Sequence, residues 1–205
     1  MKPEDKNMES RILEAAQELF VKQGFAKTTT AQIAKSAGCN QALVHYYYRT
    51  KDNLFEKVYE EKIRFMATNI LGAGLTGNTF EEKITRMVET HFDFLMKNTR
   101  LVPFLFNEFS SNPDRIQPLV DKLKQYPISV FRQIESYLKE EIAKGRLRPV
   151  SGVDLLLTIF SLNVIPFLMQ PILQRALNVS EEDYRKLLQH RKQETVETIL
   201  SRLRK

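Results

Sequence analysis

The sequence predicts an all-α protein. Apolar side chains recur at three- and four-residue spacing along nearly the whole chain, and no segment shows sustained strand-type alternation. Glycines, prolines and capping residues divide this pattern into about nine helices. With 205 residues and 42% hydrophobic content, the chain is long enough to bury a core in one or two compact domains.

The first two expected helices lie close together. Residues 7–23 carry an apolar stripe of helical period. Thr29 and Gln32 have the spacing of a capping box that opens the second helix. Gly38 can adopt the left-handed backbone conformation that ends it.

A third short helix follows at once. Asn40 is a favourable N-cap, and Val44 and Tyr48 share one face at i, i+4 spacing. Two helices joined by a tight turn with glycine describe a helix-turn-helix, whose second helix enters the DNA major groove. The sequence therefore predicts a DNA-reading element within residues 24–51.

The charge distribution favours the same interpretation. The net charge is +6, and residues 1–51 hold eight basic and five acidic side chains. No acid lies between Leu19 and Lys51, so this stretch presents a field of one sign that suits a polyanion. A solvated basic face on a small helical domain would look similar. The rings of His45 and Tyr46, which the core does not need by spacing, favour DNA.

The sequence pattern also predicts helices for the rest of the chain. Thr50 caps a helix over about 51–71, a loop is expected over 72–78, and Thr79 with Glu82 opens a helix that runs to about residue 97. Prolines then keep the helices short.

Three more helices complete the expected order. One begins at Tyr126 and Pro127 and ends at Gly145. Ser151 opens an apolar helix over about 152–176, bent near Pro166 and Pro171, and Ser180 opens the last helix, over about 181–203.

Residues 155–174 carry no charge and meet the length of a membrane span. Polar residues and prolines interrupt them, however, and no second span accompanies them, so a buried helix is expected and no membrane. The single cysteine, Cys39, rules out an internal disulfide, and the first ten residues lack the apolar core of a signal peptide. We expect a cytoplasmic protein.

Over the stretch from Arg11 to Leu54 the chain resembles a known family. The matching segments are ILEAAQELF, the turn at Gly24 and Phe25, TTTAQIAKSAG, NQALVHYYY and TKDNLF, with their spacing intact. This stretch is similar to the DNA-binding region of the TetR family of bacterial transcriptional repressors. Ala42 stands where the family often has glycine, so the operator sequence stays open.

The resemblance implies an organisation and a function. Residues 1–50 would form the DNA-binding domain and residues 51–205 an effector-binding and dimerisation domain. The protein would bind a palindromic double-stranded DNA operator as a homodimer, paired through the last two helices. A small hydrophobic effector of unknown identity would release it. No cofactor and no metal are implied.

The expected DNA contacts come from the starts of the second, third and fourth helices. Residues in the first turns of the third helix are expected to contact the base edges, since those turns point into the groove. The family's phosphate-contact positions fall on threonine, tyrosine and lysine side chains, and His45 suits either role. The predicted DNA-binding residues are Thr29, Thr30, Asn40, Gln41, Ala42, Leu43, His45, Tyr46 and Lys51.

The C-terminal part is rich in aromatic residues and methionine, which is typical of ordinary core but also of a domain that encloses an apolar cavity. The predicted effector-pocket residues are Phe65, Met66, Phe92, Met96, Phe104, Phe109, Phe131, Phe160, Asn163 and Phe167. The candidate polar anchors, each of which has the alternative of a surface or structural role, are His91, Asn107, Glu108, Tyr126, Tyr137 and Asn163. Phe65 and Met66 would connect this pocket to the helix over 51–71.

Two other classes of protein are compatible with a helical chain. A helical enzyme would need a catalytic constellation, yet the three histidines are isolated and neither a metal-binding motif nor a glycine-rich phosphate loop occurs. No catalytic residue is therefore predicted. A helical module that binds only protein partners leaves the acid-free basic stretch unexplained.

Overall fold

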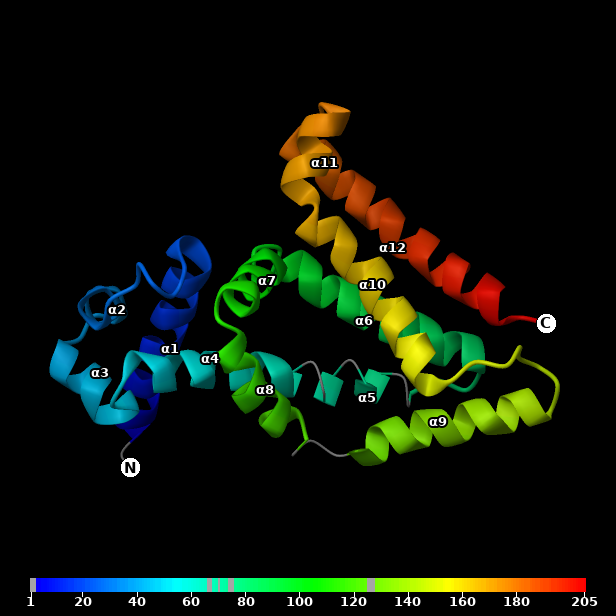
Figure 1. Cartoon of the computed structure of the whole chain (residues 1–205), viewed down its shortest axis with the longest axis horizontal. Helices are drawn as coiled ribbons and strands as arrows, with labels where there is room; N and C mark the ends of the chain where they lie inside the picture. Colours follow the sequence, from blue (N-terminus) through cyan, green and yellow to red (C-terminus); the bar gives the residue numbers. More distant parts are fainter. Residues whose placement is uncertain (1–2, 66–67, 70, 74–75, 125–127) are drawn as a thin grey trace. The chain divides into compact units, whose positions relative to one another are not determined.

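The protein is helical along almost its entire described length. The computed structural model describes residues 3–65, 68–69, 71–73, 76–124 and 128–205. Within these ranges the helices run from α1 to α12 with one 3-10 turn, η2, and the only β-type pairing is an isolated bridge between Leu147 and Arg204 (Figure 1). The predicted all-α class is confirmed.

The chain divides into two compact units. Unit 1 comprises Met1–Arg64 and Phe104–Gln125, and unit 2 comprises Phe65–Pro103 and Tyr126–Lys205. The helix-turn-helix region thus shares its unit with a segment that lies more than fifty residues further along the chain. The functional division after residue 50 stays a prediction.

Unit 1 is built from seven helical elements. These are α1 (Pro3–Gln23), α2 (Thr30–Ala37), α3 (Gln41–Tyr48), α4 (Lys51–Phe65), α7 (Leu101–Ser111), η2 (Pro113–Arg115) and α8 (Ile116–Leu123). The unit boundaries fall within two of these helices, so α4 belongs to unit 1 as far as Arg64 and α7 belongs to it from Phe104 onward. Helix α1 begins four residues earlier than the expected residue 7.

An aromatic cluster fills the centre of unit 1. The ring of Phe20 packs against those of Phe25 and Phe55, with centroids 5.6 and 5.3 Å away. Tyr59 extends the cluster, because its ring centroid lies 4.5 Å from that of Phe55 and 6.3 Å from that of Phe104. Such contacts bury large apolar surfaces in preferred ring geometries. They join α1 and α4 to α7.

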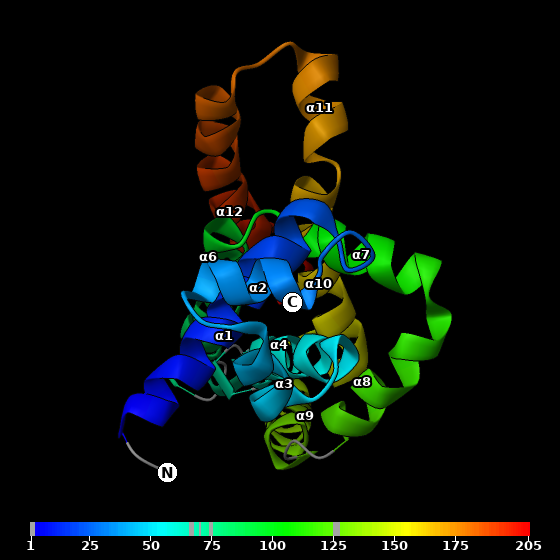
Figure 2. The same cartoon turned by 90° about the vertical axis from the view of Figure 1, so that its left-hand side faces the viewer.

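Unit 2 has its own core. Its elements are α5 (Leu71–Ala73), α6 (Phe80–Lys97), α9 (Ile128–Ala143), α10 (Gly152–Leu168), α11 (Gln170–Leu177) and α12 (Glu181–Leu203). The buried side chains of this core come from α6, α9, α10 and α12 and include Ile84, Val88, Leu138, Ile159 and Ile199. Helices α10 and α12 pack against each other and lie side by side in Figure 1, and Figure 2 shows the same helices from a direction turned by 90°.

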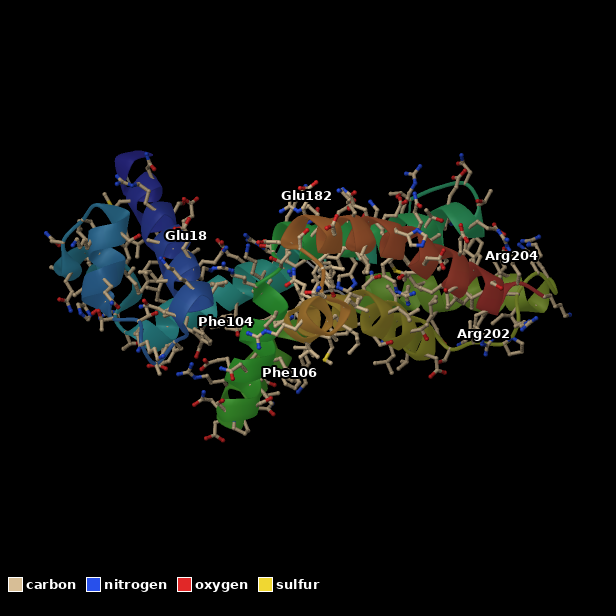
Figure 3. All side chains as sticks on the ribbon, turned by 90° about the horizontal axis from the view of Figure 1, so that it is seen from above. Glu18, Phe104, Phe106, Glu182, Arg202 and Arg204 are labelled. Atoms are coloured by element: carbon tan, nitrogen blue, oxygen red, sulfur yellow. The ribbon has the colours of Figure 1, made fainter. Side chains whose placement is uncertain are left out.

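Capping residues begin three helices of unit 2, α6, α10 and α12, where the sequence predicted. The hydroxyls of Thr79, Ser151 and Ser180 each accept a hydrogen bond from the backbone N–H three residues later, at 3.0–3.1 Å. Acidic residues in the first turn of α12, including Glu182, and Arg202 in its last turn complement the helix dipole (Figure 3). The loop expected over 72–78 starts later than predicted, because residues 71–73 form a helical turn.

The apolar stretch bends where the prolines stand. Helices α10 and α11 meet at Met169 with an angle of 61° between Pro166 and Pro171, as predicted. The hydroxyl of buried Tyr184 donates to the Pro166 carbonyl at 2.7 Å and satisfies an acceptor at this bend. Of the helices described, none alone is long and apolar enough to cross a membrane; α10 and α11 pass that test only as a bent pair.

Candidate nucleic-acid interface

The start of α2 is fixed by a reciprocal pair of hydrogen bonds. The Thr29 hydroxyl accepts from the Gln32 N–H at 3.2 Å, and the Gln32 side-chain oxygen accepts from the Thr29 N–H at 2.9 Å. The Gln23 amide adds a donor to Gln32 at 3.1 Å. The predicted capping box is confirmed, and it holds the neighbouring Thr30 at the exposed end of the helix.

The turn between α2 and α3 depends on one glycine. Gly38 has φ +68°, and its N–H donates to the carbonyls of Ala34 and Lys35. A side chain there would adopt a strained backbone conformation and meet the Arg11 guanidinium at 2.6 Å. Asn40 then accepts from the Leu43 N–H at 2.9 Å and caps α3. Both predicted turn residues are confirmed.

Helix α3 has an inner and an outer face. Val44 and Tyr48 are buried, as predicted, and the Tyr48 hydroxyl donates to the Glu9 carbonyl at 3.1 Å. Burial, with smaller contributions from Glu9, Glu61 and Tyr47, raises the pKa of Tyr48, so this phenol stays protonated and remains a donor. The predicted DNA-facing residues of α3 are exposed (Gln41, Ala42, His45 and, at 77%, Tyr46), except Leu43, which is half-buried.

A short polar chain joins these outer residues. The Gln41 amide donates to the Thr30 hydroxyl at 2.8 Å, which ties the first turn of α3 to that of α2. His45 Nδ1 lies 3.0 Å from the Arg49 carbonyl, so that nitrogen carries the proton and Nε2 accepts from Gln41 at 3.4 Å. The structure thus brings together the side chains of Thr30, Gln41 and His45.

Lys51 makes structural contacts that the sequence did not predict. Its ammonium donates to the carbonyls of Phe25 at 3.0 Å and Thr28 at 2.9 Å, and it lies 4.0 Å above the Phe25 ring. An ammonium has three donors, so one stays available for an external acceptor. Lys51 therefore fastens the start of α4 to the turn that precedes Thr29.

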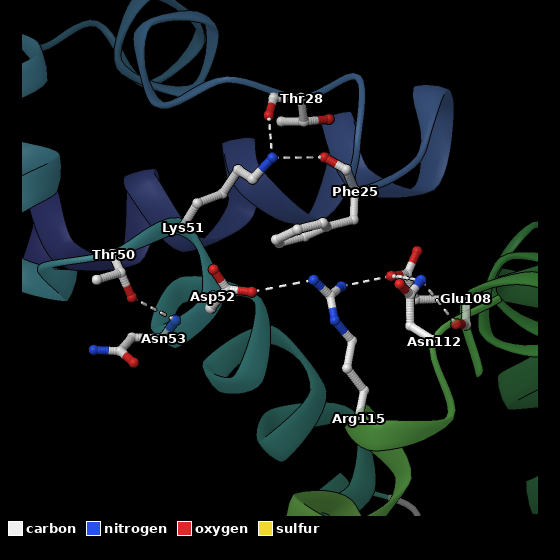
Figure 4. Close-up of polar contacts among 9 residues, drawn as sticks. All are labelled: Phe25, Thr28, Thr50, Lys51, Asp52, Asn53, Glu108, Asn112 and Arg115. Carbon is white, nitrogen blue, oxygen red and sulfur yellow. Dashed lines mark hydrogen bonds and ion pairs between the residues drawn. The ribbon is translucent and has the colours of Figure 1, made fainter.

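Arg115 forms a cluster that the sequence did not predict (Figure 4). Its guanidinium donates to Glu108 at 2.5 Å and to Asp52 at 3.1 Å. The same group stacks over the Phe25 ring, 3.7 Å from the centroid, and lies 4.7 Å from that of Phe55. We call these five residues the Arg115 cluster. It ties η2 and α7 to the beginning of α4.

The predicted effector-pocket residues that the structure describes are divided between the two units, and the pocket stays a prediction. Phe104 and Phe109 surround Tyr59 in unit 1. In unit 2 the rings of Phe92 and Phe167 are in contact, with centroids 5.2 Å apart, whereas Met96 is half-buried. Met66 and Tyr126 lie outside the described residues, as do the side chains of Phe65 and Phe131.

A separate polar pair occupies the interior of unit 2. Asn163 is fully buried on α10, and its amide nitrogen lies 3.2 Å from Nδ1 of buried His91 on α6. The ring of Phe160 stacks on His91 at 5.5 Å. Burial lowers the pKa of His91 to about 4, so the imidazole is neutral at physiological pH.

This pKa shift predicts a pH-dependent stability. His91 has a pKa of about 4 in the fold and about 6.5 when unfolded, so between these pH values only the unfolded chain binds the proton. The free energy of unfolding should therefore fall as the pH is lowered, by about 2 kcal/mol between pH 7 and pH 5 from this residue alone. Urea unfolding of wild type and His91→Gln at both pH values measures it.

The variant should lose that part of the pH dependence. His190→Gln, which changes an exposed histidine of α12, is the matched control and should keep it. Equal pH dependence in wild type and His91→Gln would contradict the burial argument.

In the residues that the structure describes, no group of three or more histidine, cysteine or acidic side chains could hold a metal ion.

Comparisons with known proteins agree with this geometry. Residues 12–58 match the family model of bacterial regulatory proteins of the tetR family, and residues 81–199 match the model of the tetracyclin repressor-like C-terminal domain. The probable HTH-type transcriptional regulator YttP of Bacillus subtilis is 25% identical over 171 residues, 80% of this chain and 76% of that protein. QacR of Staphylococcus aureus is 38% identical over 52 residues, 25% of this chain and 28% of QacR.

Solved structures share the fold. The fatty acid degradation regulator FadR from Bacillus halodurans superposes with a TM-score of 0.64 at 16% identity, covering 96% of each chain. A TetR-family transcriptional regulator from Haemophilus influenzae gives a TM-score of 0.66 at 14% identity and covers 100% of both chains. At these identities the likeness concerns the fold alone.

Proposed function

Because the chain belongs to the TetR family of bacterial transcriptional regulators, we propose that two copies of it bind a palindromic DNA operator and repress transcription until an apolar effector releases them. The observation that carries the DNA part is the polar chain Thr30–Gln41–His45 on the exposed side of α2 and α3. It holds three groove- or phosphate-type side chains in fixed positions, which reduces the ordering cost of binding. A cytoplasmic location follows from this role.

The proposed contacts divide into two kinds. Thr29, Thr30, Tyr46 and Lys51 contact phosphates and position the protein, whereas Gln41, Ala42 and Leu43 face base edges. His45 accepts from Gln41 through Nε2, so a base or phosphate that contacts His45 would replace that bond. Asn40 contributes mainly by capping α3. A gel-shift titration on an operator selected from random DNA tests the proposal as a whole. If the protein shows no preference for any DNA sequence, the proposal is wrong.

Substituting Lys51 with alanine should weaken binding to all DNA sequences alike. One ammonium donor is open to a phosphate, and each lost phosphate contact flattens the slope of log K against log salt by about 0.9, or about 1.8 for a dimer. Operator titrations across salt concentrations measure it. Arg202→Ala removes one exposed charge from unit 2 and is the control. An unchanged slope for Lys51→Ala would remove Lys51 from the phosphate contacts.

Substituting Gln41 with alanine should instead change sequence preference. A glutamine amide can pair with adenine N6 and N7, and such a contact is worth about 1–3 kcal/mol of discrimination. We therefore expect a loss of preference at one symmetric pair of operator positions, measured by selection from a randomised library. Gln133→Ala, an exposed site on α9, is the control. If the selected sequences are the same as for wild type, Gln41 reads no base.

We place effector sensing in the C-terminal part and pairing on α10 and α12. Val153, Leu157 and Phe160 form an exposed apolar stripe on α10, although such side chains favour burial. A second copy that covers this stripe would make a two-fold interface and fix the spacing of the two α3 helices.

A further inference from the structure

The contacts of Asn163 determine the proton positions of the buried pair. The Asn163 amide nitrogen donates to the Val88 carbonyl at 3.1 Å and to His91 Nδ1 at 3.2 Å. A flipped amide would place two oxygens face to face at Val88, so this orientation is the favourable one. His91 Nδ1 is then an acceptor, and the single proton of the neutral ring is on Nε2.

Two polar atoms remain without a protein partner. His91 Nε2 and the Asn163 side-chain oxygen are both buried and make no hydrogen bond within the described part of the chain. An unmet buried donor or acceptor costs about 1–3 kcal/mol, and here the two are complementary. The pair can therefore bind a group that accepts one hydrogen bond and donates another.

We propose that His91 and Asn163 bind the uncharged hydroxyl group of an otherwise apolar ligand. The hydroxyl oxygen accepts from the Nε2–H of His91, and its proton is donated to the side-chain oxygen of Asn163. The inference rests on the proposed function only in assigning this ligand the role of effector. It gives that effector a chemical class.

Other head groups fit the pair less well. A carboxylate cannot donate to the Asn163 oxygen, and an ammonium cannot accept from the His91 N–H. Either ion would also be buried beside a neutral imidazole, without a counter-charge from the pair. An ether accepts from His91 but leaves the Asn163 oxygen unmet. The pair thus selects a group that is both donor and acceptor.

One aromatic ring covers a face of the imidazole. Phe160 stacks on His91 with an angle of 19° between the planes, and it is 49% exposed whereas His91 is 3% exposed. The stacked ring lies over the face of the imidazole, whereas the Nε2–H bond lies in the ring plane, so Phe160 does not occupy the hydrogen-bonding position of Nε2.

Two isomeric probes test the proposal on the full chain. Octan-1-ol and 1-methoxyheptane have the same atoms, but only the alcohol can donate a hydrogen bond. Calorimetric titration should show the alcohol binding at least about tenfold more tightly, because one unmet acceptor costs about 1.4 kcal/mol or more. Octanoate at neutral pH should bind more weakly than the alcohol.

Three variants test which residues cause the preference for the alcohol over the ether. Asn163→Leu should reduce the preference for alcohol over ether to near unity, and His91→Phe, which keeps a ring under Phe160, should weaken both probes. Ser161→Ala, an exposed site on α10, should behave as wild type. Circular dichroism melts establish that each variant is folded. In wild type, alcohol binding should shift the Nε2–H signal of His91 in histidine-labelled protein.

Several results would overturn the proposal. These are equal affinity for the two isomers, no binding of the alcohol, or a preference that survives in folded Asn163→Leu. The DNA titration of wild type is independent of these measurements. If the chain binds no operator yet selects the alcohol, the regulatory function fails and the hydroxyl site stands; the reverse result removes only the site.

Discussion

Replacing Arg115 with alanine is expected to destabilise unit 1 by about 3 kcal/mol. The substitution leaves the carboxylate of Glu108, whose side chain is 7% exposed, without its ion-pair partner. Breaking a buried pair costs about 3–5 kcal/mol, and the lower end applies because Arg115 itself is partly exposed. The stacking of the guanidinium on Phe25 is lost as well.

Hydrogen exchange of α4 amides measures this effect within unit 1. A loss of about 3 kcal/mol corresponds to exchange that is roughly a hundredfold faster for amides that open only with the whole unit. Amides of α12 in unit 2 provide the internal comparison, and Arg148→Ala, an exposed site, provides the control variant. Unchanged protection in α4 would show that the Arg115 cluster contributes little.

A second substitution identifies the cause. In the Arg115→Ala background, Glu108→Gln removes the unpaired charge while it keeps a similar shape and a hydrogen-bonding group. It should restore part of the protection, whereas Glu108→Gln alone should reduce it. If both changes simply add, the loss comes from the stacking on Phe25 and not from the carboxylate.

The Arg115 cluster also offers a route for induction. It fixes the first turn of α4 and the turn before α2 to a segment that lies after residue 103. A ligand that binds one arrangement of that segment better than another would shift the position of α2 and α3. The sequence predicts a different route, through Phe65 and Met66, and both side chains lie outside the described part of the chain.

The sequence predicted what local chemistry determines. Capping by Thr29 and Asn40 and the left-handed turn at Gly38 follow from side chains within a few residues, and the structure confirms all three. The burial of Val44 and Tyr48 follows equally from helical period. The exposed surface of α3 could therefore be inferred from the positions that remain.

Long-range partners could not be found in this way. Arg115 and Asp52 are 63 residues apart, and nothing in the spacing of either pairs them. His91 was isolated in the sequence, and its neighbour Asn163 lies 72 residues further along. The residue type alone also does not tell which rings meet, whereas packing within unit 1 brings Phe104 and Phe109 to Tyr59 and packing within unit 2 brings Phe92 to Phe167. Tertiary contact determines each of these relations.

Replacing Leu157 with glutamate is expected to separate the dimer and weaken operator binding by more than about a thousandfold. Leu157 is 62% exposed at the centre of the apolar stripe on α10, so two symmetry-related glutamates would meet in the interface. If two equivalent half-sites share a binding free energy of about −12 kcal/mol, one subunit alone retains about half of it. The dissociation constant then lies far above the nanomolar range, so binding is much weaker.

Sedimentation and operator titration measure this result together. Leu157→Glu should sediment as a monomer and bind a full palindrome no more tightly than a single half-site. Phe106→Glu makes a similar apolar-to-acid change at an exposed site on α7 and should stay dimeric. A Leu157→Glu protein that remains dimeric and keeps wild-type affinity would place the interface elsewhere. A monomer with wild-type affinity would instead show that pairing is not needed, because each subunit then binds its half-site independently.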